Sequence, residues 1–171
     1  MNVLGKIIAL GALTAMAACT NNDPSGLGGF GNGANGANGA LASGSPSDPR
    51  SPAYFQQTIG DRVLFAVDQS TLTPQAQTVL EGQAQWLLAN PDYVATIEGH
   101  ADEQGTREYN LALGARRANA AREYLISRGV AGNRLTTVSY GKERPIEICS
   151  TEDCYSKNRR AVTVLTGSTL G

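Results

Sequence analysis

The side chains best suited to chemistry lie close together, between Glu98 and Leu125. This stretch, EGHADEQGTREYNLALGARRANAAREYL, contains the only histidine among the 171 residues. A catalytic zinc site uses about three protein ligands and usually more than one histidine, so His100, Asp102 and Glu103 fall short of one. No phosphate-binding glycine loop, nucleophile elbow or serine in a catalytic context occurs. We therefore expect no enzyme, no metal and no cofactor, and assign His100 a hydrogen-bonding role near the site or in the core.

Asn110 and Arg117 would share one face of a helix, because their spacing corresponds to about two helical turns. They would lie about 10 Å apart along the axis, with Gly114 between them. A glycine inside a helix costs about 1 kcal/mol relative to alanine, so its presence needs a reason. Two reasons remain open: the missing side chain leaves a slot for another molecule, or it lets the helix approach the sheet closely.

Asp102, in the loop before this helix, can face the same slot as Arg117. One negative and one positive group at a fixed separation suit a zwitterion, whose carboxylate would accept two parallel hydrogen bonds from the guanidinium. The alternatives are an ion pair between Asp102 and Arg117, or two solvated surface charges. Arg116 and Glu108 are expected to face solvent.

Strands and helices around this stretch must position these side chains. Apolar runs and turn residues predict strands at residues 62–67, 93–98, 135–140 and 160–165. Thr73 and Pro74 begin a helix that ends at Asn90, and a longer helix ends at Gly129. The apolar stripe of the longer helix consists of Leu111, Gly114, Ala118, Ala121 and Leu125. A further helical turn is expected at residues 155–158. This order predicts an α/β (α+β) sandwich of two layers, with helices packed on a mixed sheet through right-handed crossovers.

The beginning of the chain has the layout of an export signal. Lys6 precedes an apolar run at residues 7–18, which is shorter than the about 20 residues of a membrane-spanning helix. The letters MAAC that end at Cys19 are similar to the bacterial lipobox, in which the cysteine becomes the acylated first residue. Cleavage at an Ala-x-Ala-like site at residues 15–17, giving plain secretion, stays open as the alternative.

The composition divides the remaining chain into a tether and a domain. Residues after Cys19 and up to 52 are rich in Gly, Asn, Ala and Ser and can build almost no core. We therefore predict a signal peptide at 1–18, a lipidated N-terminus with a flexible tether at 19–52, and a single domain at 53–171. With 14 Lys+Arg against 15 Asp+Glu and 6% aromatic residues, the chain offers no basic surface or stacking platform for nucleic acid.

The three cysteines are consistent with export. Lipidation of Cys19 leaves Cys149 and Cys154, which we expect to form a disulfide in an oxidising compartment. Free thiols are the alternative. Zinc is disfavoured because a second pair of ligands is needed and the lone His100 cannot supply it.

Several motifs in a fixed order resemble the OmpA-like domain family, specifically its branch of peptidoglycan-associated lipoproteins of the Tol-Pal system. The resemblance covers about residues 65–164, and the lipobox and tether fit it. The motifs that carry it are Gly99-His100-Ala101-Asp102-Glu103, Tyr109-Asn110, Leu113-Gly114, Arg116-Arg117-Ala118-Asn119, Ser139-Tyr140-Gly141-Lys142-Glu143 and Tyr155-Ser156-Lys157-Asn158-Arg159-Arg160-Ala161-Val162.

The resemblance implies noncovalent binding of the peptide stem of peptidoglycan. Asp102 and Arg117 would hold the amino and carboxylate groups of meso-diaminopimelate. The residues expected to complete or border the pocket are Asn110, Phe65, Asp68, Gly114 and Arg160. The cysteine pair is not general to the family, so the resemblance says nothing of its role.

The resemblance also implies a place in the cell and a set of partners. Acylated Cys19 would hold the protein in the outer membrane of a Gram-negative bacterium, facing the periplasm. The residue after it is Thr20, not the Asp that in such lipoproteins usually signals retention in the inner membrane. The implied partners are peptidoglycan, outer-membrane lipid, a TolB-like periplasmic propeller protein and other Tol-Pal components. Two functions therefore remain open: a cell-wall anchor, or an interaction module whose main partner is the propeller protein.

Overall fold

The computed structural model describes residues 44–167. The predicted signal peptide, Cys19 and most of the predicted tether lie outside the described residues. The described elements are α1 (Pro52–Tyr54), η1 (Phe55–Gly60), β1 (Arg62–Leu64), α2 (Pro74–Ala89), β2 (Tyr93–His100), α3 (Arg107–Ser127), η2 (Gly132–Arg134), β3 (Leu135–Gly141), α4 (Glu152–Asn158) and β4 (Arg160–Gly167).

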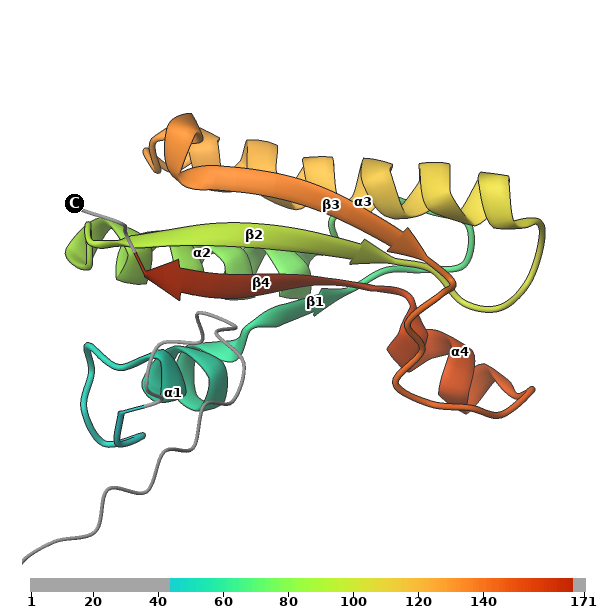
Figure 1. The fold of residues 1–171 in the computed structure, drawn as a ribbon, viewed down its shortest axis with the longest axis horizontal. Helices are drawn as coiled ribbons and strands as arrows, with labels where there is room; N and C mark the ends of the chain where they lie inside the picture. The colour runs from blue at the N-terminus through green and yellow to red at the C-terminus, as the bar shows by residue number, and fades with distance from the viewer. Residues whose placement is uncertain (1–43, 168–171) are drawn as a thin grey trace, which may run out of the picture. The chain divides into compact units, whose positions relative to one another are not determined.

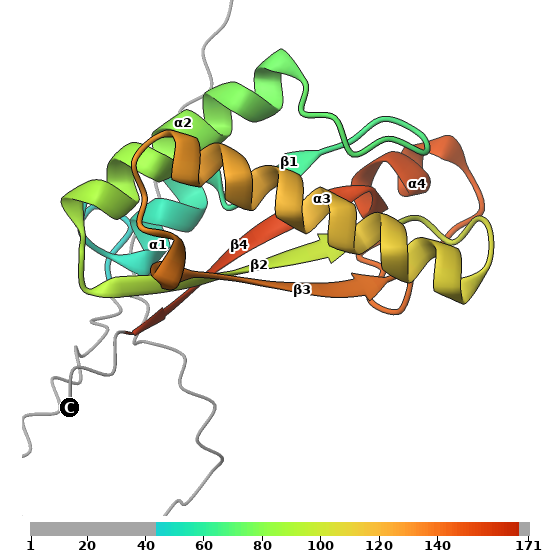
Figure 2. The same cartoon turned by 90° about the horizontal axis from the view of Figure 1, so that it is seen from above.

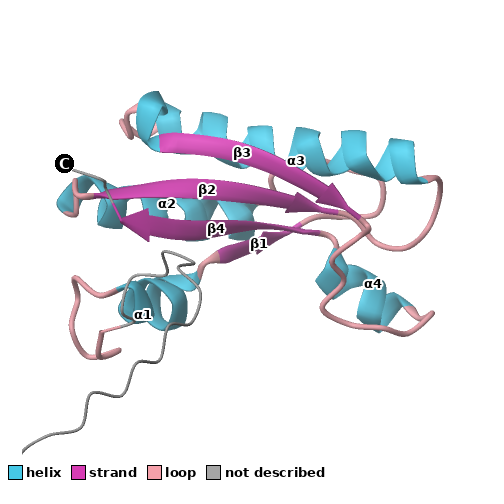
Figure 3. Cartoon of the chain, viewed as in Figure 1, coloured by secondary structure: helices cyan, strands magenta, loops and turns pink. Residues whose placement is uncertain are grey.

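The four strands form one mixed sheet in the order β1-β4-β2-β3. β2 and β3 are parallel, whereas β4 runs antiparallel to both β1 and β2. The long helix α3 is the crossover between the parallel pair, and it lies with α2 on the same face of the sheet (Figures 1, 2 and 3). The predicted two-layer fold with a mixed sheet is therefore confirmed.

The helix starts follow from their capping residues. The Thr73 hydroxyl accepts a hydrogen bond from the Ala76 amide at 3.1 Å, and Pro74 occupies the first helical position, where no intrahelical donor is lost. The Thr106 hydroxyl caps α3 in the same way, from the Tyr109 amide at 3.2 Å. These caps determine the residue at which each helix begins. The start of α3 in turn determines which of its polar side chains face the sheet.

The core lies between the helices and the sheet, and it includes Ile97 from β2, Leu80 and Leu87 from α2, and Leu125 from α3. One predicted core position is wrong. Leu111 is 49% exposed, whereas Leu113 is buried beside Gly114. At the start of α3 the buried face includes polar as well as apolar side chains, such as Asn110. The spacing of apolar residues alone therefore did not identify this face.

Gly114 belongs to the contact between α3 and the sheet. A Cβ atom on Gly114 would overlap the Ser139 hydroxyl and lie 2.8 Å from the Gly99 carbonyl oxygen, and a Cβ on Gly99 would overlap the Gly114 carbonyl. Two facing glycines thus let the helix and the strand approach closely. The interpretation of Gly114 as a ligand slot is wrong, and close approach is the reason for this glycine.

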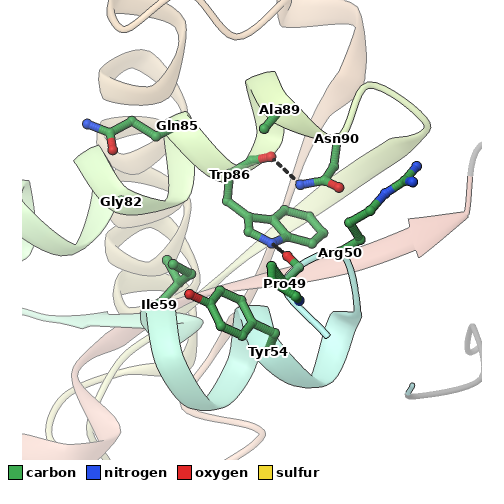
Figure 4. Close-up of a pocket in the computed structure, with 9 residues that line it drawn as sticks. All are labelled: Pro49, Arg50, Tyr54, Ile59, Gly82, Gln85, Trp86, Ala89 and Asn90. Carbon is green, nitrogen blue, oxygen red and sulfur yellow. Dashed lines mark hydrogen bonds between the residues drawn. The ribbon is translucent and has the colours of Figure 1, made fainter. Parts of the chain in front are cut away.

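The domain also begins before the predicted boundary at residue 53. The Trp86 indole donates a hydrogen bond to the Pro49 carbonyl at 2.7 Å, and the Tyr93 hydroxyl donates one to the Arg50 carbonyl at 3.2 Å. These contacts border a cavity of about 350 Å³ between this segment and α2 (Figure 4). Residues 44–52 have the composition of a tether. They nevertheless pack on the domain, because backbone carbonyls in this segment accept hydrogen bonds from Trp86 and Tyr93.

Candidate functional site

A polar pocket of about 270 Å³ lies where the chain leaves β2 and enters α3. Its walls come from the loop after β1, the loop after β2 and the first turns of α3. The lining residues are Val67, Asp68, Asp102, Gln104, Gly105, Tyr109, Asn110 and Leu113. Three of the predicted site residues, Asp68, Asp102 and Asn110, therefore meet at one pocket.

Arg117 lies beside this pocket but is completely buried, at 0% exposure. Its guanidinium donates three hydrogen bonds to backbone carbonyls: Nε to Gln69 at 2.8 Å, Nη1 to His100 at 2.9 Å and Nη2 to Ala66 at 3.1 Å. The alternative of a solvated surface charge is therefore wrong for Arg117, which belongs to the buried interior of the domain. Its donors instead join the loop after β1 to the end of β2.

Phe65 supports the guanidinium from one side. Its buried ring has its centre 5.3 Å from the central carbon of the Arg117 guanidinium, a distance at which an aromatic face attracts a cation. Phe65 does not line the pocket itself. The predicted role of Phe65 at the pocket thus becomes one of packing against Arg117.

Arg117 is a buried cation with only neutral partners. Among the described residues, no carboxylate lies within ion-pair distance of it. Burial lowers the pKa of Arg117 to about 10, and the negative charges of Asp102 and Asp68 oppose this change. The side chain is therefore still charged at neutral pH, and a carboxylate at this place would stabilise it.

Asp102 has a different cation as its partner. Its Oδ2 accepts a hydrogen bond from Arg159 Nη1 at 3.1 Å, and its Oδ1 accepts one from the Gln104 amide at 3.2 Å. The alternative of a direct ion pair between Asp102 and Arg117 is not observed. Asp102 and Arg117 lie near each other, but each is held by its own partners.

Arg159 is the site residue that sequence reasoning missed. Beyond Asp102, it contacts Glu152 through both terminal nitrogens and donates from Nε to the Phe65 carbonyl at 3.2 Å. Arg160, which was predicted near the pocket, instead donates to the carbonyls of Asn158 and Arg144. Neighbouring residues in an extended segment point to opposite sides, so one of the two arginines had to point away. The sequence signal was the Arg-Arg pair, which does not say which member faces the site.

Tyr109 and Asp68 close one side of the pocket. The Tyr109 hydroxyl donates a short hydrogen bond to Asp68 Oδ1, and this bond raises the pKa of Tyr109. Asp68 has a φ of 60°, a conformation that few residues other than glycine adopt. The loop after β1 is thus held to α3 by a contact between two exposed side chains.

Asn110 fixes the other loop. Asn110 is 1% exposed, and its side-chain amide donates a hydrogen bond to the Gln104 carbonyl at 2.7 Å. This bond ties the loop after β2, which contains Asp102, to α3. The predicted site residue Asn110 therefore lies in the pocket wall, with part of its hydrogen-bonding capacity used by the loop.

His100 does not have the expected hydrogen-bonding role. Both ring nitrogens are buried without a hydrogen-bond partner among the described residues, and Nε2 lies 3.5 Å from Glu98 Oε2. Burial lowers the pKa of His100 to about 4, and the charges of Arg160 and Arg144 act in the same direction. The neutral imidazole stacks on Tyr140, with ring centres 5.5 Å apart. Its backbone carbonyl, not its ring, contacts Arg117.

Between residues 44 and 167, no group of three or more His, Cys, Asp or Glu side chains is arranged to hold a metal ion. No helix in that range combines the length and the apolar character needed to cross a membrane. Cys149 and Cys154 are joined by a disulfide, with their Cα atoms 5.8 Å apart.

Comparison with known proteins gives a consistent family. The sequence pattern of the OmpA family matches residues 64–159. The protein named "Peptidoglycan-associated lipoprotein" of Rhizobium meliloti (strain 1021) is 52% identical over 167 residues, which covers 95% of this chain and 88% of that protein. The protein of the same name in Brucella melitensis biotype 1 is 57% identical over 120 residues, covering 70% of this chain and 71% of the relative.

Solved structures agree with this. The crystal structure of the peptidoglycan-associated lipoprotein from Burkholderia pseudomallei is 38% identical, with a TM-score of 0.63, and covers 71% of this chain and 98% of that one. The C-terminal domain of Helicobacter pylori MotB (residues 125–256) has a TM-score of 0.59 at 22% identity, over 64% of this chain and 86% of that one. The second likeness concerns the fold alone.

Proposed function

The chain belongs to the OmpA family, and we propose that it binds the peptide stem of peptidoglycan noncovalently at the pocket beside Asp102. The observation that carries this proposal is Arg117, a buried cation without a carboxylate partner among the described residues, next to a pocket lined by two acids. The names of the relatives, which describe lipoproteins associated with peptidoglycan, support the same ligand.

The chemistry of the two charges selects a zwitterion. A diaminopimelate residue carries an ammonium and a carboxylate on one carbon at its free end. The ammonium would lie against Asp102 and Asp68, and the carboxylate would pair with Arg117. A guanidinium has five N–H donors, and three are used by backbone carbonyls, so two remain for a carboxylate.

Access to Arg117 requires a movement of the loop after β1. The carbonyls of Ala66 and Gln69 hold this loop on the guanidinium, and the Tyr109–Asp68 contact holds it on α3. Ala66, Asp68 and Gln69 are themselves exposed, so this loop can shift locally while the rest of the domain stays folded. We propose that the ligand carboxylate enters as this loop shifts.

The proposal includes an anchor at the other end of the chain. Acylated Cys19 would hold the protein in the outer membrane, and the domain would reach the wall through the segment between Cys19 and the domain. The lipobox-like letters before Cys19 and the lipoprotein names of the relatives support this part. The protein would then link the outer membrane to the wall within the Tol-Pal system.

A second candidate function is docking of a TolB-like periplasmic propeller protein on the rim of the pocket. The observation in its favour is a pair of exposed side chains with apolar surface in the pocket lining: Val67 is 53% exposed and Tyr109 42%. Exposed apolar side chains next to a polar pocket are typical of a surface that contacts protein. The two functions would compete, because both use the loop after β1.

Retention by purified sacculi tests the first function. The full-length protein should pellet with sacculi, and free meso-diaminopimelate should release it. Asp102→Ala should weaken retention by roughly 30-fold or more, because the ligand's ammonium then loses its partner. Arg116→Ala, on the exposed side of α3, is the matched control and should change little. Full retention of Asp102→Ala, or retention insensitive to diaminopimelate, would rule out this site.

A further inference from the structure

The segment that carries the disulfide lies at the same end of the domain as the pocket. α4 and the loop before it follow the end of β3 and lie near the end of β2 (Figure 1). The disulfide joins Cys149 in the exposed loop to Cys154, which is 7% exposed in the first turn of α4. The closed ring of residues 149–154 therefore includes the start of α4.

Residues in and beside this ring contact the loop after β2. The Ser150 hydroxyl donates to Glu103 Oε1 at 3.0 Å, and the Tyr155 hydroxyl donates to the same oxygen at 3.1 Å. Glu103 directly follows Asp102, so two donors from the disulfide segment hold the residue next to the proposed ligand-binding carboxylate.

A second chain of contacts reaches Asp102 itself. Glu152, inside the ring, forms an ion pair with Arg159, and Arg159 donates to Asp102 Oδ2 at 3.1 Å. The Arg159 side chain is 5% exposed, and its Nε is held by the Phe65 carbonyl. Arg159 can therefore turn little, and the position of Glu152 helps to decide which way its terminal nitrogens point.

The loop has other anchors that do not depend on the disulfide. Asn158 accepts hydrogen bonds from the amides of Ile146 and Glu147 and donates one to the Glu147 carbonyl. Lys157 forms an ion pair with Glu147 at 3.1 Å. Loss of the disulfide should thus leave α4 and the domain folded while freeing the ring residues.

We propose that the Cys149–Cys154 disulfide positions the acidic wall of the pocket, acting through Glu152 and Arg159 on Asp102 and through Ser150 on Glu103. Glu152 and Arg159 are positioning residues in this scheme, because neither lines the pocket. The inference rests on the proposed ligand site, and it assigns the cysteine pair a role in ligand affinity beyond stability.

The test compares sacculus binding of four full-length variants with the unaltered, oxidised protein: Cys149→Ser, Glu152→Gln, the combination of both, and Asp153→Asn. Cys149→Ser and Glu152→Gln should each weaken binding by about 3- to 10-fold, the lower part of the range for coupled residues. The combined variant should bind sacculi no more weakly than the weaker of the two single variants, because both changes interrupt the same chain of contacts. Asp153 lies in the same ring and turn but its carboxylate contacts none of these residues, so Asp153→Asn should bind as the unaltered protein does.

The proposal would be overturned if Cys149→Ser bound sacculi as tightly as the unaltered protein. It would also be overturned if the loss of affinity in the combined variant equalled the product of the two single losses. Treatment of the unaltered protein with dithiothreitol should reproduce the Cys149→Ser result. Thermal unfolding of each variant checks that the fold is retained.

A measurement without ligand separates this inference from the proposed function. The Arg159 Nε–H proton, bonded to the Phe65 carbonyl, should exchange with solvent faster in Cys149→Ser than in the oxidised protein. If unaltered protein fails to bind sacculi, the proposed function fails, and this exchange rate still decides the positioning role. Equal exchange rates in the two proteins would remove it.

Discussion

Two arginines at opposite ends of β2 make similar bonds in different surroundings. Arg117 donates to the carbonyls of Ala66, Gln69 and His100, at the end of β2. Arg134 donates to the carbonyls of Leu87, Asn90 and Tyr93, at the start of β2. Each side chain thus joins segments that are distant in the sequence.

The difference lies in what surrounds each guanidinium. Arg134 is partly exposed and meets carbonyls at the end of α2, where the helix dipole favours a cation. Arg117 is fully buried, and it borders a pocket with two carboxylates. A similar bonding pattern therefore joins distant segments at both ends of β2, and at one end it also places a buried charge beside the pocket that we propose as the ligand site.

The largest expected effect concerns stability at the two ends. Arg117→Ala should destabilise the domain by roughly 3–5 kcal/mol, because it leaves three carbonyls without their donor and a buried void. Arg134→Ala should cost less, roughly 1–3 kcal/mol, since water can reach its carbonyls. Urea unfolding of both variants measures this. Equal costs would mean that the burial of Arg117 has no energetic consequence.

The stability of the domain should depend on pH through His100, at the end of β2 next to the pocket. Its pKa of about 4 lies below the ordinary value of 6.5, so the folded state resists protonation. Between pH 6.5 and 4 the unfolded chain binds a proton at His100 that the folded protein does not. The unfolding free energy is therefore unaffected by this group above pH 6.5 and falls by up to about 3 kcal/mol as the pH drops to 4. His100→Gln cannot titrate, so its unfolding free energy should depend less on pH in this window. Parallel pH profiles of the two proteins would contradict the assignment.

Gly114→Ala separates stability from ligand binding. The added methyl group would meet the Gly99 carbonyl and the Ser139 hydroxyl, so we expect a loss of about 1–3 kcal/mol from overpacking. The pocket residues are untouched, and sacculus binding of the folded protein should change by less than about threefold. A large loss of binding without a loss of stability would restore the slot interpretation of this glycine.

Arg116→Ala is expected to have the smallest effect. Arg116 is exposed, and its guanidinium lies 6.0 Å from the centre of the Tyr109 ring. An exposed contact of this kind contributes less than about 1 kcal/mol. Both the unfolding free energy and the binding of sacculi should therefore stay close to those of the unaltered protein. A loss comparable to that of Arg117→Ala would mean that the wrong face of α3 has been assigned.

Much of the fold could be predicted from local signals. Thr73 with Pro74 gave the start of α2, and apolar runs gave the four strands, although β1 ends at Leu64 instead of Val67. The Phe65 amide still bonds to the Arg159 carbonyl, but the chain then turns away through Asp68. The early boundary of the domain was not predictable, because the backbone of Pro49 and Arg50, not their side chains, makes the contacts.

Three of the seven predicted ligand-binding residues, Asp68, Asp102 and Asn110, line the pocket, whereas the partner of Asp102 was not predicted. Helical spacing correctly placed Asn110 and Arg117 on one face, but spacing does not say whether that face meets solvent or the loop after β1. The partner of Asp102 depended on the orientation of Arg159 and Arg160, two identical residues in succession. Such questions of orientation and burial are decided by contacts between distant segments, which no local pattern contains.

The comparison of the two arginines is tested most directly by Arg117→Lys and Arg134→Lys, assayed side by side for sacculus binding. Lysine keeps the charge but cannot donate to backbone carbonyls and a carboxylate together as a guanidinium can. With folding verified by urea unfolding, Arg117→Lys should bind roughly 30-fold or more weakly, and Arg134→Lys within about twofold of the unaltered protein. Unchanged binding by a folded Arg117→Lys, or an equal loss in Arg134→Lys, would contradict the assignment of Arg117 to the ligand site.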